Sequence, residues 1–246
     1  MGKLITVHPF IDLGVLRESV KKSIGDNHFS HIFRTVQMNQ DGRPTVVRSP
    51  FVGATEKTAN AEFERELFSS ALFDWEFRAR LYIEPSRRYI DQEFNPGISD
   101  LLFLTRNNPF VTPGHEAIII RGVLAGFQGD WMIASALLIP QVEQMMRRAL
   151  ETNGVDASTF DRDGTQPAKM FGGIFALPET EQFFGESLCF ELKGHLIEKT
   201  GYDLRNRIAH GLATDATMMS TGVVSLWWLV LNMLFCGTLP RVSPTS

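Results

Sequence analysis

Residues 223–235, Val-Val-Ser-Leu-Trp-Trp-Leu-Val-Leu-Asn-Met-Leu-Phe, are apolar apart from Ser225 and Asn232. A membrane span needs about 20 apolar residues, so this run is too short to cross a bilayer. A segment that is apolar on every side is typical of a helix enclosed by other helices. We therefore expect a buried core helix at about 216–236, in a mostly α-helical protein with no membrane role.

The N-terminal part is predicted to hold two helices and a small β-hairpin. A helix before Gly25 and a longer one from about residue 56 follow from apolar residues at helical spacing. The longer helix is expected to break near Pro85, because a residue that precedes proline avoids the helical conformation. Residues 31–38 and 45–51 are β-permissive runs around Asp41-Gly42, a pair typical of a hairpin turn.

Three further helices are predicted before the core helix, at about 116–126, 130–151 and 178–200. Asp130 is a good N-cap for the second of them. Pro140 removes a backbone hydrogen bond within that helix, so a kink or a restart is expected there. Residues 239–246 have the composition of a loose tail.

Composition indicates an ordinary globular protein, with 43% hydrophobic residues and a net charge of −4 among 246 residues. The acidic balance argues against a surface coated for non-specific nucleic-acid binding, although a local basic pocket remains compatible with it. Cys189 and Cys236 are far apart and fit neither a zinc site nor a disulfide framework. Buried free thiols in a reducing compartment are the simplest account, so we expect a cytoplasmic protein.

The segment Arg205-Asn206-Arg207-Ile208-Ala209-His210-Gly211 places an arginine five positions before a histidine. A permanent cation beside a group that titrates near neutral pH is the minimum equipment for work on a phosphodiester. The alternative is that Arg207 and His210 cap a helix C-terminus, with Gly211 as its left-handed stop.

The same segment resembles the RN-x-x-x-HG signature of DUF4209, a bacterial domain family of unknown function, and the broader R-x(4–6)-H signature of HEPN domains. The resemblance covers roughly residues 80–235. Further matches follow in chain order: Asn108-Pro109-Phe110-Val111, Pro113-Gly114-His115-Glu116, Arg121-Gly122, Gly126, Asp130, Leu137-Leu138-Ile139-Pro140-Gln141, Glu143, Arg147 or Arg148, Gly164-Thr165-Gln166 and Phe184-Gly185-Glu186.

The resemblance implies a HEPN-like helical bundle over residues 81–238, with the motif between its last two long helices. Residues 1–80 would be an N-terminal helical region carrying the hairpin. The resemblance also implies a homodimer across the Arg205/His210 motif, and a bacterial stress, toxin–antitoxin or phage-defence setting with an antitoxin or defence partner.

The activity that the resemblance implies is cleavage of RNA without a metal ion or other cofactor. His210 would move a proton at the ribose 2′-OH or at the leaving oxygen. Arg205 would stabilise charge on the phosphate, and Asn206 would orient the histidine or the phosphate. The products would end in a 2′,3′-cyclic phosphate, so DNA would not be a substrate. The alternatives are a non-catalytic nucleotide- or RNA-binding or dimeric interaction module, and a purely structural role.

Three arginines could extend a phosphate-binding surface beside the motif: Arg121, Arg147 and Arg148. For Arg147 and Arg148 we favour a simpler interpretation, in which they complement the helix dipole and stay solvated. Glu143 could orient an arginine of the site or form an internal ion pair. Gly122 and Gly126 are expected to permit close helix contacts rather than to cradle a phosphate.

A metal site is not predicted. Glu191, His195 and Glu198 could share one helical face, but the second matching set that a di-iron bundle requires is missing. We expect these three side chains to form a solvated face. Walker, dinucleotide-binding and zinc-protease motifs are absent from the sequence.

Overall fold

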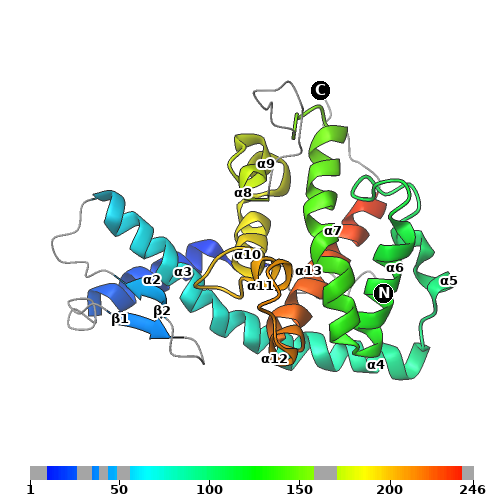
Figure 1. The fold of residues 1–246 in the computed structure, drawn as a ribbon, viewed down its shortest axis with the longest axis horizontal. Helices are drawn as coiled ribbons and strands as arrows, with labels where there is room; N and C mark the ends of the chain where they lie inside the picture. Colours follow the sequence, from blue (N-terminus) through cyan, green and yellow to red (C-terminus); the bar gives the residue numbers. More distant parts are fainter. Residues whose placement is uncertain (1–9, 27–34, 39–43, 49–55, 158–170, 240–246) are drawn as a thin grey trace.

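The computed structural model describes residues 10–26, 35–38, 44–48, 56–157 and 171–239 (Figure 1). The described part of the chain is mostly helical, as predicted. The elements follow in this order: α2 (Leu13–Asp26), β1 (Thr35–Met38), β2 (Pro44–Arg48), α3 (Glu56–Arg78), η1 (Ala79–Ile83), α4 (Glu84–Phe94), α5 (Ile98–Leu101), η2 (Leu102–Leu104), α6 (Glu116–Gln128), α7 (Trp131–Thr152), α8 (Phe171–Phe175), α9 (Pro178–Phe184), α10 (Glu186–Leu196), α11 (Leu204–Ala209), α12 (Asp215–Met218) and α13 (Thr221–Thr238).

Helix α13 is the core helix, which confirms the prediction made from residues 223–235. It contacts α3, η1, η2, α6, α7 and α10, and Val230 and Leu234 have no exposed surface. The stretch Asp215–Thr238 is 24 residues long and apolar enough to cross a membrane by length and composition. However, 72% of its most apolar window is buried inside the fold. Its apolar surface is therefore already covered by the neighbouring helices.

Two glycines of α6 let neighbouring helices approach closely, as predicted. A Cβ atom at Gly126 would overlap the indole of Trp227, and one at Gly122 would overlap Leu138 of α7. The Trp227 indole donates a hydrogen bond to the carbonyl oxygen of Val123 at 3.0 Å. The bare backbone of α6 thus forms the socket in which the largest side chain of α13 is seated.

The predicted break at Pro85 is wrong, because α3, η1 and α4 form one continuous helical rod (Figure 1). The π-helical turn η1 interrupts the α-helical register, and Glu84 keeps helical angles of φ −64° and ψ −43°. Pro85 lies in the first turn of α4. Proline has no N–H to donate, and the change from π-helical to α-helical register directly before it accommodates the missing donor without ending the rod. The domain boundary expected after residue 80 falls inside η1.

Two predicted helices are each divided in the structure. Gly185, with φ 79° and ψ 153°, separates α9 from α10 within the segment predicted at 178–200. The segment predicted at 216–236 begins with the short helix α12, and α13 starts after Ser220. Helix α7 does not restart at Pro140, since it is assigned as one helix from Trp131 to Thr152. Its predicted N-cap is confirmed, because the Asp130 carboxylate accepts a hydrogen bond from the Ile133 amide.

The solvated face predicted for α10 is wrong, because Glu191 and His195 are almost completely buried. Glu191 accepts hydrogen bonds from the Arg78 guanidinium at 2.7 Å and from the Ile11 amide at 2.8 Å. These bonds attach α10 to α3 and to the segment before α2. The pKa of the Glu191 carboxyl is raised by burial, and Arg78 opposes that shift. The third member of the predicted face, Glu198, is half-buried.

His195 is enclosed between aromatic rings and remains neutral. Its Nδ1 lies 2.7 Å from the carbonyl oxygen of Glu191, so the Nδ1–H is the donor. The ring centroids of Trp75 and Tyr202 lie 4.4 and 5.4 Å away. Burial lowers the pKa of His195 to about 3.

The remaining predictions concern the chain's ends, the strands and the thiols. Strands β1 and β2 pair antiparallel, with Thr35 opposite Arg48. Residues 31–34, 39–43 and 49–51 of the predicted hairpin and the tail at 240–246 lie outside the described residues. Cys189 is buried as expected, whereas Cys236 is exposed because it lies on the outer face of the last turns of α13.

The unfolding free energy is expected to decrease as the pH is lowered, because of His195. The unfolded chain binds a proton on this ring near pH 6.5, whereas the folded chain does so only near pH 3. Unfolding free energy should therefore drop as the pH falls through this window, by up to about 1.4 kcal/mol per pH unit. His195→Gln should flatten this slope in urea unfolding curves recorded from pH 7 to pH 4. His210→Gln, at an exposed position, is the matched control, and identical slopes for the parent and His195→Gln would contradict the assignment.

The α6–α13 contact should not tolerate a single added methyl group. Gly126→Ala is expected to cost about 1–3 kcal/mol of unfolding free energy, because the new Cβ overlaps the buried Trp227 indole. Gly172→Ala in α8 is the control, since a Cβ there meets no atom within 4 Å. Denaturant unfolding measures both changes. A Gly126→Ala protein as stable as the parent would show that the two helices are not in contact at this point.

Candidate functional site

The Arg205–Gly211 motif forms helix α11 and its C-terminal cap. Gly211 has φ 66°, its amide donates to the Ile208 carbonyl, and the Leu212 amide donates to the Arg207 carbonyl at 2.7 Å. This pair of bonds is the Schellman motif, in which a left-handed glycine ends a helix. The left-handed stop at Gly211, which belongs to the alternative interpretation of the motif as a helix cap, is therefore confirmed, and His210 occupies the C-cap position.

The side chain of His210 is presented to solvent by this cap. The residue is exposed, and no hydrogen bond or ion pair joins its ring to any other residue that the structure describes. Its backbone amide alone is engaged, donating to the Asn206 carbonyl at 3.1 Å. The ring nitrogens are thus open to solvent, as they would also be in a histidine that only caps the helix.

Arg205 is held in place by a carboxylate of α7. Its guanidinium lies 3.6 Å from Glu143 Oε2, and only 28% of its side chain is exposed. Glu143 also pairs with Arg147 at 2.9 Å, so one carboxylate lies between two arginines from different helices. Both roles considered for Glu143 therefore apply, since it positions Arg205 and forms an ion pair within α7.

Asn206 contacts its neighbours in the motif rather than the histidine ring. Its amide nitrogen donates to Asp203 Oδ1 at 2.6 Å, and its carbonyl oxygen lies 3.4 Å from Arg205 Nη1. Burial raises the pKa of the Asp203 carboxyl, while the Asn206 bond and the positive charges of Arg207, Lys199 and His210 lower it. Asn206 therefore couples Arg205 to a carboxylate within electrostatic reach of His210.

Asp203 was not predicted from the sequence as a residue of this site. The available signal was an aspartate directly before a helix, which usually marks an N-cap. The structure puts Asp203 at that position with a left-handed φ of 53°, but its side chain caps no amide. It bonds Asn206 instead, so the N-cap rule would have found the residue and given it the wrong partner.

The three arginines predicted to extend the site differ from one another. Arg121 is exposed on α6, and its guanidinium has no hydrogen bond or ion pair with another described residue. Arg147 is 12% exposed and bound to Glu143 and Gln144, so the prediction that it stays solvated is wrong. Arg148 is half-buried, and its Nε is enclosed without a partner among the described atoms, so it is not fully solvated either.

Arg205 and His210 both belong to helix α11 and its C-terminal cap, and no contact joins their side chains among the described residues. The motif offers a cation paired with Glu143, an amide bonded to Asp203 and an exposed imidazole that no described residue binds. Within the described ranges, no group of three or more His, Cys, Asp or Glu residues is placed to hold a metal ion. The chemistry that these residues support by themselves is anion binding combined with general acid–base catalysis.

Comparison with known proteins identifies no relative. No family model, curated protein or solved structure matches this chain. The functional assignment therefore depends on the residues and the geometry described above.

Proposed function

We propose that this protein is a HEPN-type endoribonuclease that cleaves RNA without a metal ion, using Arg205 and His210. The observation that carries the proposal is the exposed imidazole of His210, which no described residue binds, at the end of a helix whose Arg205 is paired with Glu143. The helical fold and the position of the motif before the long core helix α13 are compatible with a HEPN-like bundle.

The proposed reaction begins with removal of a proton from a ribose 2′-OH by His210. The 2′-oxygen attacks the adjacent phosphorus, and the bond from phosphorus to the 5′-oxygen breaks. The leaving 5′-oxygen takes up a proton from water or from the protonated His210 of a second copy, so the products carry a 2′,3′-cyclic phosphate and a 5′-hydroxyl. Arg205 stabilises the charge that grows on the non-bridging oxygens during this step.

Glu143 and Asn206 act as positioning residues in this scheme. At 3.6 Å, the Arg205–Glu143 contact is an ion pair too long for a hydrogen bond, so the guanidinium keeps donors free for a phosphate. Asn206 contacts both Arg205 and Asp203, so it connects the arginine to the residue directly before α11. Arg121, exposed on α6, is a further candidate for a phosphate contact.

A homodimer across the motif would place two copies of this sparse site together. One arginine and one histidine provide either a base or an acid, whereas two copies provide both. Exposed apolar side chains flank the motif, since Leu212 is 67% and Met219 is 59% exposed. A two-fold axis brings such a patch against itself, so these residues would contribute apolar contacts to the interface. A bacterial stress or defence setting, with an antitoxin or a similar partner, belongs to the same proposal.

The second candidate function is a non-catalytic module that binds a nucleotide or an RNA end. The pairing of Arg205 with Glu143 favours it, because this carboxylate offsets part of the positive charge with which Arg205 would stabilise a transition state. The two candidates differ in the fate of the RNA, which is cut in the first case and only retained in the second.

The nuclease should cut RNA in the presence of EDTA. Purified protein incubated with a mixed RNA pool is expected to release fragments with 2′,3′-cyclic phosphate ends, which ligation-based end mapping identifies. A pool methylated at the 2′-oxygens should stay intact, because the attacking hydroxyl is blocked. Binding of RNA without any cleavage would favour the binding module, and cleavage of the methylated pool would exclude the proposed reaction.

Removing either principal side chain should abolish cleavage without unfolding the protein. His210→Ala is expected to slow cleavage by about 10²–10⁴-fold, the usual contribution of a general acid or base. Arg205→Ala should give a loss of about 10²-fold or more, because charge on the phosphate is no longer offset. Single-turnover cleavage rates and melting temperatures measure the two effects separately.

Arg88→Ala on α4 is the matched control for loss of an arginine, since its side chain is 64% exposed and pairs only with Glu84. It should keep the parent's rate. A His210→Ala protein that cuts normally would remove His210 from the mechanism, and a large drop in melting temperature for both motif variants would favour a structural role.

A further inference from the structure

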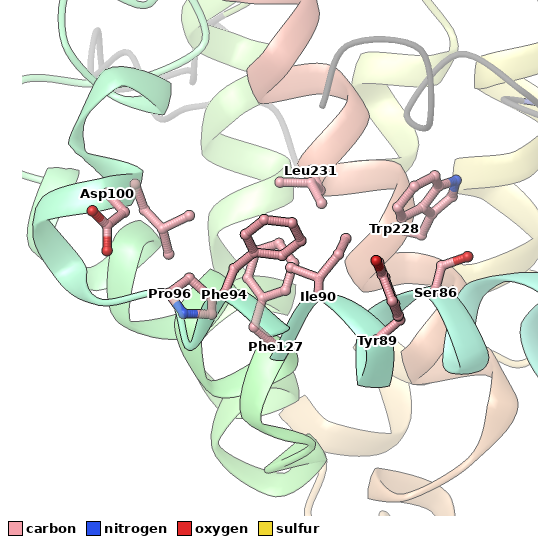
Figure 2. Close-up of a pocket in the computed structure, with 10 residues that line it drawn as sticks. Ser86, Tyr89, Ile90, Phe94, Pro96, Asp100, Phe127, Trp228 and Leu231 are labelled. Atoms are coloured by element: carbon pink, nitrogen blue, oxygen red, sulfur yellow. The ribbon is translucent and has the colours of Figure 1, made fainter. Parts of the chain in front are cut away.

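A cavity of about 600 Å³ opens beside α13, remote in sequence from the Arg205–Gly211 motif (Figure 2). Its walls come from α4, α5, the end of α6 and α13. The lining is mainly apolar and aromatic: Ser86, Tyr89, Ile90, Phe94, Pro96, Asp100, Leu101, Phe127, Trp228 and Leu231. Cavities of roughly 300–1,000 Å³ with such a lining are typical small-molecule sites.

Two aromatic side chains of α4 form the exposed rim of this cavity. Tyr89 is 58% and Phe94 is 69% exposed, and their rings meet edge to face with centroids 6.3 Å apart. Leu231 and Phe127 form its buried floor. Aromatic surface in this quantity is costly to leave in water, so an apolar ligand that covers it would bind favourably.

The shape and the charge of the cavity restrict the ligand. Figure 2 shows Asp100 at one end of the row of side chains, Phe94 and Ile90 in the middle, and Tyr89 with Ser86 at the other end. Among the described lining residues, Asp100 alone carries a charge, and its side chain is exposed at the end of the cavity. Its Oδ2 accepts a hydrogen bond from the Gly97 amide at 2.8 Å, and no described residue bonds its Oδ1.

No basic side chain competes for this carboxylate within the lining. The nearby Arg87 of α4 turns toward Glu84 and the Phe127 carbonyl, and its guanidinium lies over the Trp131 ring. An anionic ligand would therefore meet Asp100 without a compensating cation. A cationic group meets both a carboxylate and the faces of aromatic rings, which attract cations.

We propose that this cavity binds an elongated apolar amine. Its alkyl or aryl body would lie along Phe94, Ile90 and Tyr89, against Trp228, and its ammonium group would bind Asp100. This site shares no residue with the proposed nuclease site, so the outcome of its test does not depend on whether the protein cleaves RNA.

Three ligands with the same ten-carbon chain test the proposal directly: decylamine, decanol and decanoate. Binding is measured at pH 7 by isothermal titration calorimetry below micellar concentrations, with tryptophan fluorescence as a second readout. Decylamine should bind about tenfold or more tightly than decanol, because a charge-assisted hydrogen bond forms only with the amine. Decanoate should bind most weakly. Equal affinities for all three, or a preference for decanoate, would overturn the proposal.

The variant Asp100→Asn removes the negative charge of the cavity while keeping the local fold, so it tests the contribution of that charge to binding. The asparagine oxygen can still accept from the Gly97 amide, so the start of α5 is retained. The variant should bind decylamine and decanol with similar affinity while keeping the parent's melting temperature. A preference for decylamine that survives in Asp100→Asn would place the cation elsewhere and overturn the assignment.

The rim variants locate the ligand. Tyr89→Ala and Phe94→Ala should each weaken decylamine binding by about tenfold without unfolding the protein, since both rings are largely exposed. Phe73→Ala on α3 is the matched control, because Phe73 is 78% exposed and lies outside the cavity lining. Binding that is unchanged in the rim variants, or reduced equally in the control, would overturn the proposed site.

Discussion

The structure depends on the close approach of α6 and α13 at Gly126 and Trp227. The indole takes the space that any side chain at Gly126 would occupy, and its N–H bonds the Val123 carbonyl of the same helix. This contact fixes the depth and rotation of the core helix, against which α3, α7 and α10 also pack. The position of α11 follows indirectly, because α11 rests on α7 and α10. The geometry around His210 is therefore set by packing some distance away from it.

Hydrophobic pattern predicted the helices well and their interruptions poorly. The runs before Gly25 and at 223–235 became α2 and α13 because each had apolar residues, such as Leu13 and Val20 in α2, that could pack into a core. The interruptions depend on single-residue geometry that pattern does not contain. Gly185 divides α9 from α10 by taking an extended positive-φ conformation, whereas Pro85 and Pro140 interrupt nothing. In both proline cases the surrounding helix tolerates a missing N–H, and only the tertiary context decides that.

The residues of the candidate site could be named from the sequence, but the contacts that hold them in place could not. Arg205, Asn206 and His210 are neighbours in sequence and fall on one short helix and its cap, and the glycine cap followed from residue type alone. The partners Glu143 and Asp203 come from the tertiary arrangement and from an unusual backbone angle at Asp203. The same limitation explains Glu191 and His195. Charged residues at helical spacing suggest solvent, but Arg78, the Ile11 amide and Trp75 provide a buried environment that sequence spacing cannot reveal.

The π-helical turn η1 has a geometric consequence for the rod formed by α3 and α4. A π turn accommodates about one residue more than an α turn, and each residue rotates an α-helix by about 100°. The face of α4 is therefore out of phase with the face of α3 by about that angle. Without this offset, a different set of α4 residues would lie on the side of the rod where Trp75 and Ala79 face the core. The extra residue thus sets the rotation of α4 relative to α3. Trp75 and Ala79 face the core at one end of the rod, and α4 lines the cavity beside Trp228 at the other end.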